Sequence, residues 1–350
     1  MEKTLPNRAI EWRQGQLILL DQRQLPSTVE FLQINNVNEV FCAIKDMVVR
    51  GAPAIGITAA YGVVLSAIHH EHCELKLAIS KIKADMDLLV TARPTAINLK
   101  WSIDRMQACL ENSTDNFVES LEAEAIQIHD EDIAANNKMG ELGAEYIQDS
   151  VNVMTHCNAG ALATGGYGTA LGVIRCAFSQ GKIESVFANE TRPWFQGARL
   201  TAWELQQENI PVNLICDSAA ASALRAHNVE WIIVGADRVA ANGDVANKIG
   251  TYGLAALAKH VGKKFMVVAP TSTIDLNSAS GNDVAIEERG SQEVTHVAEK
   301  AIASKGVNVW NPVFDITPAE LIDVLVTEHG VVETPNQEKI AQLFADKDNN

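Results

Sequence analysis

Positive charge is scarce in this sequence of 350 residues. There are 28 Lys and Arg residues against 44 Asp and Glu residues, so the formal net charge is −16 at pH 7. Proteins that bind nucleic acid or anionic membranes over a broad surface are usually basic, and this composition argues against both classes of partner. An anionic small-molecule substrate would need a local pocket of basic side chains.

Cysteine pairs are also missing. The six cysteines are scattered without CxxC spacing, a pattern that indicates neither a zinc ribbon nor a disulfide framework and favours reduced thiols. One histidine-rich cluster, from His69 to Cys73, follows an apolar helical segment. We interpret it as an exposed helix end, where cationic side chains interact favourably with the helix dipole, and we assign no metal.

Signals for export or membrane insertion are not apparent. Residues 1–13 alternate between polar and apolar types and lack the basic and then apolar pattern of a secretory signal. We also expect no apolar run long enough to span a bilayer. The sequence therefore predicts a soluble, cytoplasmic protein.

A glycine-rich segment, residues 156–172, is the most informative motif that is present. In it Cys157 follows the apolar run Val151–Met154, which predicts a thiol at the carboxyl end of a strand, before a helix that starts near Thr169. The glycine spacing has one residue too many for a dinucleotide fingerprint, and no Gly-Lys-Ser/Thr sequence follows. A dehydrogenase is therefore weakly supported, while a buried structural role for Cys157 and a chemical role are equally supported by the local pattern.

The first part of the chain, residues 1–148, predicts a small α+β domain. It opens with a hairpin whose turn is Arg13–Gln16 and continues with amphipathic helical stretches. These stretches are Val40–Val49, Ala54–Ile68, Leu75–Val90, Ala96–Leu110 and the connecting helix Val118–Ile147.

The second part, residues 149–350, alternates between strands and helices. Predicted strands are Val151–Met154, Ser185–Ala188, Val212–Cys216, Trp231–Val234 and Lys264–Val268; predicted helices are Thr169–Ser179, Arg199–Glu208, Ala219–Ala226 and Lys248–His260. Such alternation is typical of parallel βαβ units. The predicted class is therefore α/β, with the small N-terminal α+β domain followed by a Rossmann-like, doubly wound parallel sheet.

Polar or small residues follow each of the five predicted strands. They are Cys157; Glu190, Thr191 and Arg192; Asp217 and Ser218; Asp237 and Arg238; and Pro270, Thr271 and Ser272. Because parallel strands end at one edge of a sheet, we expect these residues to line one crevice, where a thiol and several carboxylates suit proton transfer. Asp217 is most simply a helix N-cap, and the Glu190 loop is equally a salt-bridged loop or a site wall. Asp237 follows a buried strand, which favours a functional role.

Six segments in order along the chain resemble one known family. They are Arg50–Gly56, Ala92–Leu99, His156–Gly160, Glu190–Leu200, Gly235–Arg238 and Asn242–Gly250. In these segments the sequence closely resembles the methylthioribose-1-phosphate isomerases, within the superfamily that includes the regulatory subunits of translation initiation factor 2B. The family pattern often has aspartate where Asn189 stands and threonine where Ala159 stands.

The resemblance implies an aldose–ketose isomerase of methionine salvage that acts on 5-methylthioribose 1-phosphate. It implies Cys157 and Asp237 as the catalytic pair and, as residues that hold the phosphosugar, Arg50, Gly51, Ala52, Arg93, Gln196, Asn247 and Lys248. It further implies a homodimer with no redox cofactor and no metal. The residue types agree, because arginine, lysine and backbone N–H groups beside glycine are suited to binding phosphate.

Other functions stay open at this point. A ribose-1,5-bisphosphate isomerase shares the cysteine and the aspartate, and a regulatory subunit shares the fold without catalysis. Retention of Cys157, Asp237 and the Asn247–Lys248 pair favours an enzyme. Whether hydrogen moves between the sugar carbons as hydride or through an enol is also open.

Overall fold

The computed structural model describes residues 8–94, 96–113, 116–148 and 150–345. They form two compact units: one contains the chain up to Lys138 together with Ala159–Gly172, and the other contains Met139–Asn158 together with the chain from Val173 onward. The sequence predicted a single boundary between residues 148 and 149. The structure instead places the boundary within helix α5 (Phe117–Ala144) and adds most of the glycine-rich segment to the first unit.

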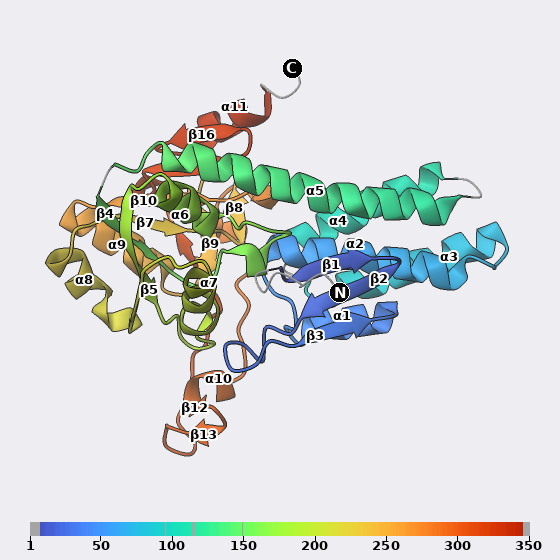
Figure 1. Cartoon of the computed structure of the whole chain (residues 1–350), viewed down its shortest axis with the longest axis horizontal. Helices are drawn as coiled ribbons and strands as arrows, with labels where there is room; N and C mark the ends of the chain where they lie inside the picture. The colour runs from blue at the N-terminus through green and yellow to red at the C-terminus, as the bar shows by residue number, and fades with distance from the viewer. Residues whose placement is uncertain (1–7, 95, 114–115, 149, 346–350) are drawn as a thin grey trace. The chain divides into compact units, whose positions relative to one another are not determined.

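The first unit combines a small antiparallel sheet with helices (Figure 1). Its strands, in the order β1-β2-β3, are β1 (Ile10–Arg13), β2 (Gln16–Leu20) and β3 (Phe31–Ile34), and its helices before α5 are α1 (Val37–Lys45), α2 (Ala52–His70), α3 (Leu75–Val90) and α4 (Ile97–Asn112). The predicted hairpin and all five predicted helices are confirmed, with ends shifted by a few residues. Strand β3 was not predicted, because four residues carry too short a pattern.

Helix α2 is the core of the first unit. It packs against α1, α3 and α4. The helix has 19 residues, and an 18-residue window in it has a mean hydropathy of 1.5, so by length and composition it could cross a membrane. The expectation that no such run exists is therefore wrong for this helix. Because 83% of its apolar window is buried inside the protein, its composition is that of a core helix.

Helix α5 holds the glycine-rich segment in the first unit. The Gly165 N–H donates to Asp132 Oδ2 at 2.7 Å, and His129 Nε2 donates to the Gly165 carbonyl oxygen at 2.9 Å. His129 Nδ1 then accepts from the Tyr61 hydroxyl at 3.0 Å. Burial lowers the pKa of His129, which agrees with this neutral tautomer. These contacts explain why the segment from Ala159 to Gly172 belongs to the first unit.

The second unit is built on a seven-stranded sheet in the order β16-β15-β10-β7-β4-β5-β6 (Figure 1). Its strands are β4 (Val151–Thr155), β5 (Ile183–Asn189), β6 (Val212–Ile215), β7 (Val229–Val234), β10 (Lys264–Val268), β15 (Val324–Thr327) and β16 (Gly330–Glu333). All neighbours are parallel except β15 and β16. The chain runs from β4 outward to β6 and then returns to the other side of β4 with β7. The Rossmann-like, doubly wound sheet is therefore confirmed.

Helices and short elements complete the second unit. They are α6 (Ala170–Ser179), which begins in the first unit, a π-helical turn η2 (Gly197–Thr201), α7 (Ala202–Gln207), α8 (Ala220–Ala226), α9 (Thr251–Val261), α10 (Gln292–Thr295), α11 (Gln337–Ala345), and the short strands β12 (His296–Val297) and β13 (Lys300–Ala301). The predicted helix Arg199–Glu208 is thus a π-helical turn followed by α7.

A second, four-stranded sheet replaces the start of one predicted helix. Its order is β11-β8-β9-β14, with β8 (Arg238–Ala240), β9 (Val245–Lys248), β11 (Ile274–Asp275) and β14 (Phe314–Thr317). The prediction that Lys248 begins a helix is wrong. All four β9 residues are buried between two neighbouring strands, and α9 begins only after Gly250, whose φ of 103° ends the strand.

We expect Gly165→Ala to destabilise the first unit much more than Gly166→Ala. A Cβ at Gly165 would lie 2.6 Å from the His129 ring, which two hydrogen bonds hold in place, whereas a Cβ at Gly166 would meet only Ile133 at 3.4 Å. Overpacking of this kind typically costs about 1–3 kcal/mol. Urea unfolding of both variants measures the difference, and equal free energies of unfolding would contradict the close contact at Gly165.

Candidate active site

The ends of three neighbouring parallel strands define the centre of the candidate site. Cys157 follows β4, Thr191 follows β5 and Asp237 follows β7, and β4 lies between the other two. The direction in which the chain adds strands reverses between β4 and β7. In open α/β sheets, ligands bind beyond the carboxyl ends of the strands at such a reversal. Cys157 and Asp237 therefore follow the two strands on either side of it.

Cys157 has an unusual backbone conformation. Its φ is +62°, in the left-handed region, and the residue is 9% exposed. Its N–H donates to Thr191 Oγ1 at 2.8 Å, and its carbonyl oxygen accepts from Thr201 Oγ1 at 2.5 Å. A left-handed conformation is costly for a residue with a side chain, and such strain concentrates at functional sites.

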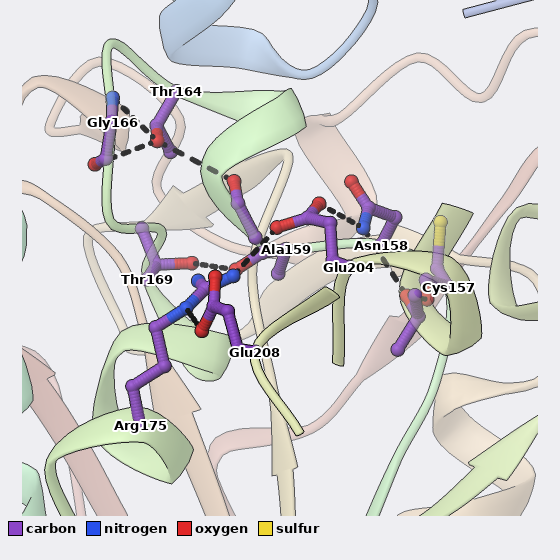
Figure 2. A network of polar contacts seen from close by, with 11 residues as sticks. Cys157, Asn158, Ala159, Thr164, Gly166, Thr169, Arg175, Glu204 and Glu208 are labelled. Carbon is purple, nitrogen blue, oxygen red and sulfur yellow. Dashed lines mark hydrogen bonds and ion pairs between the residues drawn. The ribbon is translucent and has the colours of Figure 1, made fainter. Parts of the chain in front are cut away.

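A buried polar chain lies next to this turn (Figure 2). Asn158 Nδ2 donates to Glu204 Oε1 at 2.8 Å and to Thr201 Oγ1 at 3.2 Å. The other Glu204 oxygen pairs with Arg175 at 2.8 Å, and Arg175 also contacts Glu208 at 2.6 Å. Glu204 is fully buried, so its charge requires these partners. No local motif in the sequence marks these residues, so they were not predicted.

His156 connects the Cys157 turn to the segment after β9. Its Nε2 lies 2.9 Å from the Ile249 carbonyl oxygen, which can only accept, so Nε2 carries the hydrogen. Its Nδ1 then accepts from the Asn189 amide at 3.3 Å. Burial lowers the pKa of His156 and keeps the ring neutral. Asn189 Oδ1 is buried without a hydrogen-bond partner among the described residues.

Strand β9 places two more of the predicted residues. Asn247 and Lys248 are 5% and 7% exposed. Lys248 Nζ donates to the Val313 carbonyl oxygen at 3.2 Å and lies 4.5 Å from the centre of the Phe314 ring. The Asp237 N–H donates to the carbonyl oxygen of Ala246, the residue before Asn247, at 3.0 Å. The structure thus joins the Asp237 loop directly to the strand that carries the buried ammonium group.

Asp315 is a site residue that the sequence did not indicate. Its carboxylate accepts from the Gly250 N–H at 2.7 Å and from the Tyr252 N–H at 3.1 Å, so it fixes the turn between β9 and α9. Burial raises the pKa of Asp315 to about 6, although these N–H groups and Lys248 act in the opposite direction. Asp315 lies far along the chain from every motif, and only strand pairing brings it beside Asn247.

Asp217 does not cap a helix, so the N-cap interpretation is wrong. Its two carboxylate oxygens accept from the backbone N–H groups of Thr191 and Arg192, at 2.8 and 2.7 Å. Asp217 is itself the first residue of a short 3-10 helix, Asp217–Ala219, which has no side-chain cap. Asp217 instead shapes the loop that ends at Gln196, a buried residue whose Oε1 has no hydrogen-bond partner in the described part of the chain.

The remaining four predicted residues belong to the first unit. Gly51, with φ +98°, precedes α2, and Ala52 is the first residue of that helix. A Cβ on Gly51 would lie 2.6 Å from the Ala163 backbone, so glycine is required there. Arg50 and Arg93 are both half-buried. Cys157, Gln196, Asp237, Asn247 and Lys248 belong to the second unit.

Comparison with known proteins identifies relatives over nearly the whole chain. The model of the initiation factor 2 subunit family matches residues 48–334. A Thioalkalivibrio sulfidiphilus protein named methylthioribose-1-phosphate isomerase is 54% identical over 96% of this chain and 97% of its own.

Two solved structures are also similar. The Pyrococcus horikoshii 5-methylthioribose 1-phosphate isomerase has a TM-score of 0.92 at 40% identity, covering 99% of both chains. A structure from A. fulgidus named as translation initiation factor eIF-2B, subunit delta, has a TM-score of 0.86 at 43% identity, covering 96% of this chain and 99% of the other.

We expect Asn189→Asp to raise the pKa of His156. The substitution replaces an amide donor at Nδ1 with a carboxylate, which favours a second ring N–H. In the parent protein the folded-state pKa is below the unfolded value of about 6.5, so acidification through that value removes stability. The variant should lose less stability on acidification. Nitrogen-15 NMR of the imidazole and unfolding at several pH values measure both effects.

Asn213→Asp is the matched control, because Asn213 lies exposed on β6. An unchanged His156 titration in Asn189→Asp would contradict the assigned tautomer.

Proposed function

The chain belongs to the initiation factor 2 subunit family, and within that family we propose that it is a methylthioribose-1-phosphate isomerase. It would convert 5-methylthioribose 1-phosphate to 5-methylthioribulose 1-phosphate in methionine salvage. The observation that carries the proposal is the position of Cys157 and Asp237. They follow β4 and β7, the two strands between which the order of strand addition reverses. The 54% identity to a protein of that name, over nearly the full length of both chains, supports it.

The proposed chemistry opens the sugar ring while the phosphate ester stays intact. Asp237 donates a proton to the ring oxygen as the bond from that oxygen to carbon 1 breaks. The hydrogen on carbon 2 moves to carbon 1, and Asp237 takes the proton of the 2-hydroxyl as carbon 2 becomes a carbonyl. Cys157 lies beside the carbon 1–carbon 2 bond. The carboxyl group returns to its starting state, and the reaction is a net isomerisation.

Substrate binding is assigned to the seven other residues that the family resemblance indicates. Lys248, Arg50 and Arg93 supply positive charge to the phosphate, and the backbone around Gly51 and Ala52 supplies the start of helix α2. A hydroxyl of the sugar can donate to the buried Oε1 of Gln196, which has no hydrogen-bond partner among the described residues. Asn247 is the remaining polar contact. Buried acceptors of this kind are costly unless a ligand satisfies them.

A non-catalytic regulatory role is the second candidate. It is favoured by the 43% identity to the A. fulgidus protein named as an initiation factor subunit. Turnover of a panel of sugar 1-phosphates by the purified protein separates the candidates. Conversion of 5-methylthioribose 1-phosphate supports the isomerase, preference for ribose 1,5-bisphosphate supports the related enzyme, and conversion of none supports the regulatory role.

A homodimer and a cytoplasmic location complete the proposal. The homodimer is implied by the family resemblance, and the cytoplasmic location is inferred from the sequence pattern. Light scattering of the purified protein and cell fractionation test them.

We expect Asp237→Asn to lose most turnover and to keep substrate binding. A general acid or base typically contributes a factor of about 10² to 10⁴ to the rate. Single-turnover kinetics and equilibrium binding separate the two properties. Asp323→Asn, in a residue whose carboxylate pairs with the exposed Lys264, is the control. Near-normal turnover of Asp237→Asn would exclude its catalytic role.

Arg93→Ala and Lys248→Ala should each weaken substrate binding. Charge-assisted contacts to an anion are usually worth about 1.5–3 kcal/mol each. For the same reason, unphosphorylated methylthioribose should be a very poor substrate. Calorimetric titration measures the affinities, with Lys83→Ala, at an exposed surface ion pair, as the control. Unchanged affinity in both variants would place the phosphate elsewhere.

A further inference from the structure

We propose that Thr201, Asn158 and the buried Glu204–Arg175 pair are positioning residues that fix the direction of the Cys157 thiol. The inference rests on the proposed function, because it concerns the geometry of the catalytic cysteine. None of these four residues belongs to the predicted set of substrate contacts.

The backbone of Cys157 is held from both sides by threonine hydroxyl groups. Thr191, after β5, accepts the Cys157 N–H, and Thr201, in the η2 turn, donates to the Cys157 carbonyl oxygen. The two contacts come from separate parts of the chain that close on one residue. Because a left-handed φ is disfavoured for cysteine, the surroundings must impose it.

The available donors and acceptors favour one orientation of the Thr201 hydroxyl and of the Asn158 amide. Thr201 has a single hydroxyl hydrogen, which goes to the Cys157 carbonyl oxygen, so its oxygen accepts from Asn158 Nδ2. The second hydrogen of that amide goes to Glu204. A rotated hydroxyl or a flipped amide would leave a buried donor or acceptor without a partner.

The ion pair anchors this chain in the two helices beside the turn. Glu204 lies in α7 and is fully buried, and Arg175 lies in α6 and is 8% exposed. Both Glu204 oxygens are occupied, one by Asn158 and the other by Arg175. Figure 2 shows the Cys157 sulfur directed away from Glu204 and Arg175. The chain therefore fixes the peptide of Cys157 through its N–H and carbonyl groups, and these contacts do not involve the thiol.

The test compares three substitutions of buried threonines. Thr201→Val keeps the shape and removes the hydroxyl, and Thr201→Ser restores the hydroxyl. Thr155→Val is the matched control, because Thr155 is also buried and donates to a carbonyl, that of Ile233 at 2.8 Å, but makes this contact within the sheet. Each variant is measured for kcat, KM, thermal midpoint and the rate at which iodoacetamide alkylates Cys157.

We expect Thr201→Val to lower kcat by up to about 100-fold with little change in KM, since small misplacements of reacting groups have effects of this size. Alkylation of Cys157 should become faster, because the turn relaxes. Thr201→Ser should recover most of kcat. Thr155→Val should lower the thermal midpoint as much as Thr201→Val but leave kcat and the alkylation rate unchanged.

Two results overturn the inference. One is a kcat and an alkylation rate in Thr201→Val equal to those of the unmodified protein; the other is a loss of kcat that is equal in Thr201→Val and Thr155→Val. Failure of the proposed function looks different, because the unmodified protein would then not convert 5-methylthioribose 1-phosphate. In that case the alkylation rates still decide whether Thr201 holds the Cys157 turn.

Discussion

The left-handed turn at Cys157 is the constraint on which the rest of the candidate site depends. The residue follows β4, the strand on one side of the reversal in the sheet, and its peptide groups are tied to Thr191 and Thr201. These two hydrogen bonds require the loop after β5 and the η2 turn to lie beside the end of β4. Asp217 shapes one of these loops through two backbone N–H groups, and Glu204 anchors the other region through Asn158.

In the second unit, the buried ammonium group of Lys248 lies at the end of β9, next to groups whose charge depends on burial. The protein carries a formal net charge of −16, yet Lys248 is 7% exposed. His156, which contacts the adjoining Ile249, is neutral because burial lowers its pKa. Asp315 accepts two N–H groups in the same turn, and burial raises its pKa to about 6. Protonation of Asp315 near that pH would remove a negative charge beside Lys248 and strengthen the local attraction for an anion.

The sequence predicted those parts that depend on neighbouring residues. Apolar runs that alternate with helical segments predicted the parallel sheet. The reactive side chains that follow the predicted strands indicated Cys157 and Asp237. Lys248, the last residue of β9, was mistaken for the start of a helix, because β9 pairs with β14, which lies far along the chain. Asp315 and Glu204 were missed for the same reason: their partners, Gly250 and Arg175, come close only after folding. Asp217 resembles an N-cap locally, but a distant loop offers better donors.

Two solved structures at 40% and 43% identity carry different names, one an isomerase and the other an initiation factor subunit, and both superpose closely on this chain. What distinguishes a catalytic member is therefore the chemistry at the edge of the sheet. In this chain the left-handed, buried Cys157 is held by several buried polar partners. This set of partners, together with the similarity to isomerases over nearly the whole chain, supports the conclusion that the chain is an enzyme.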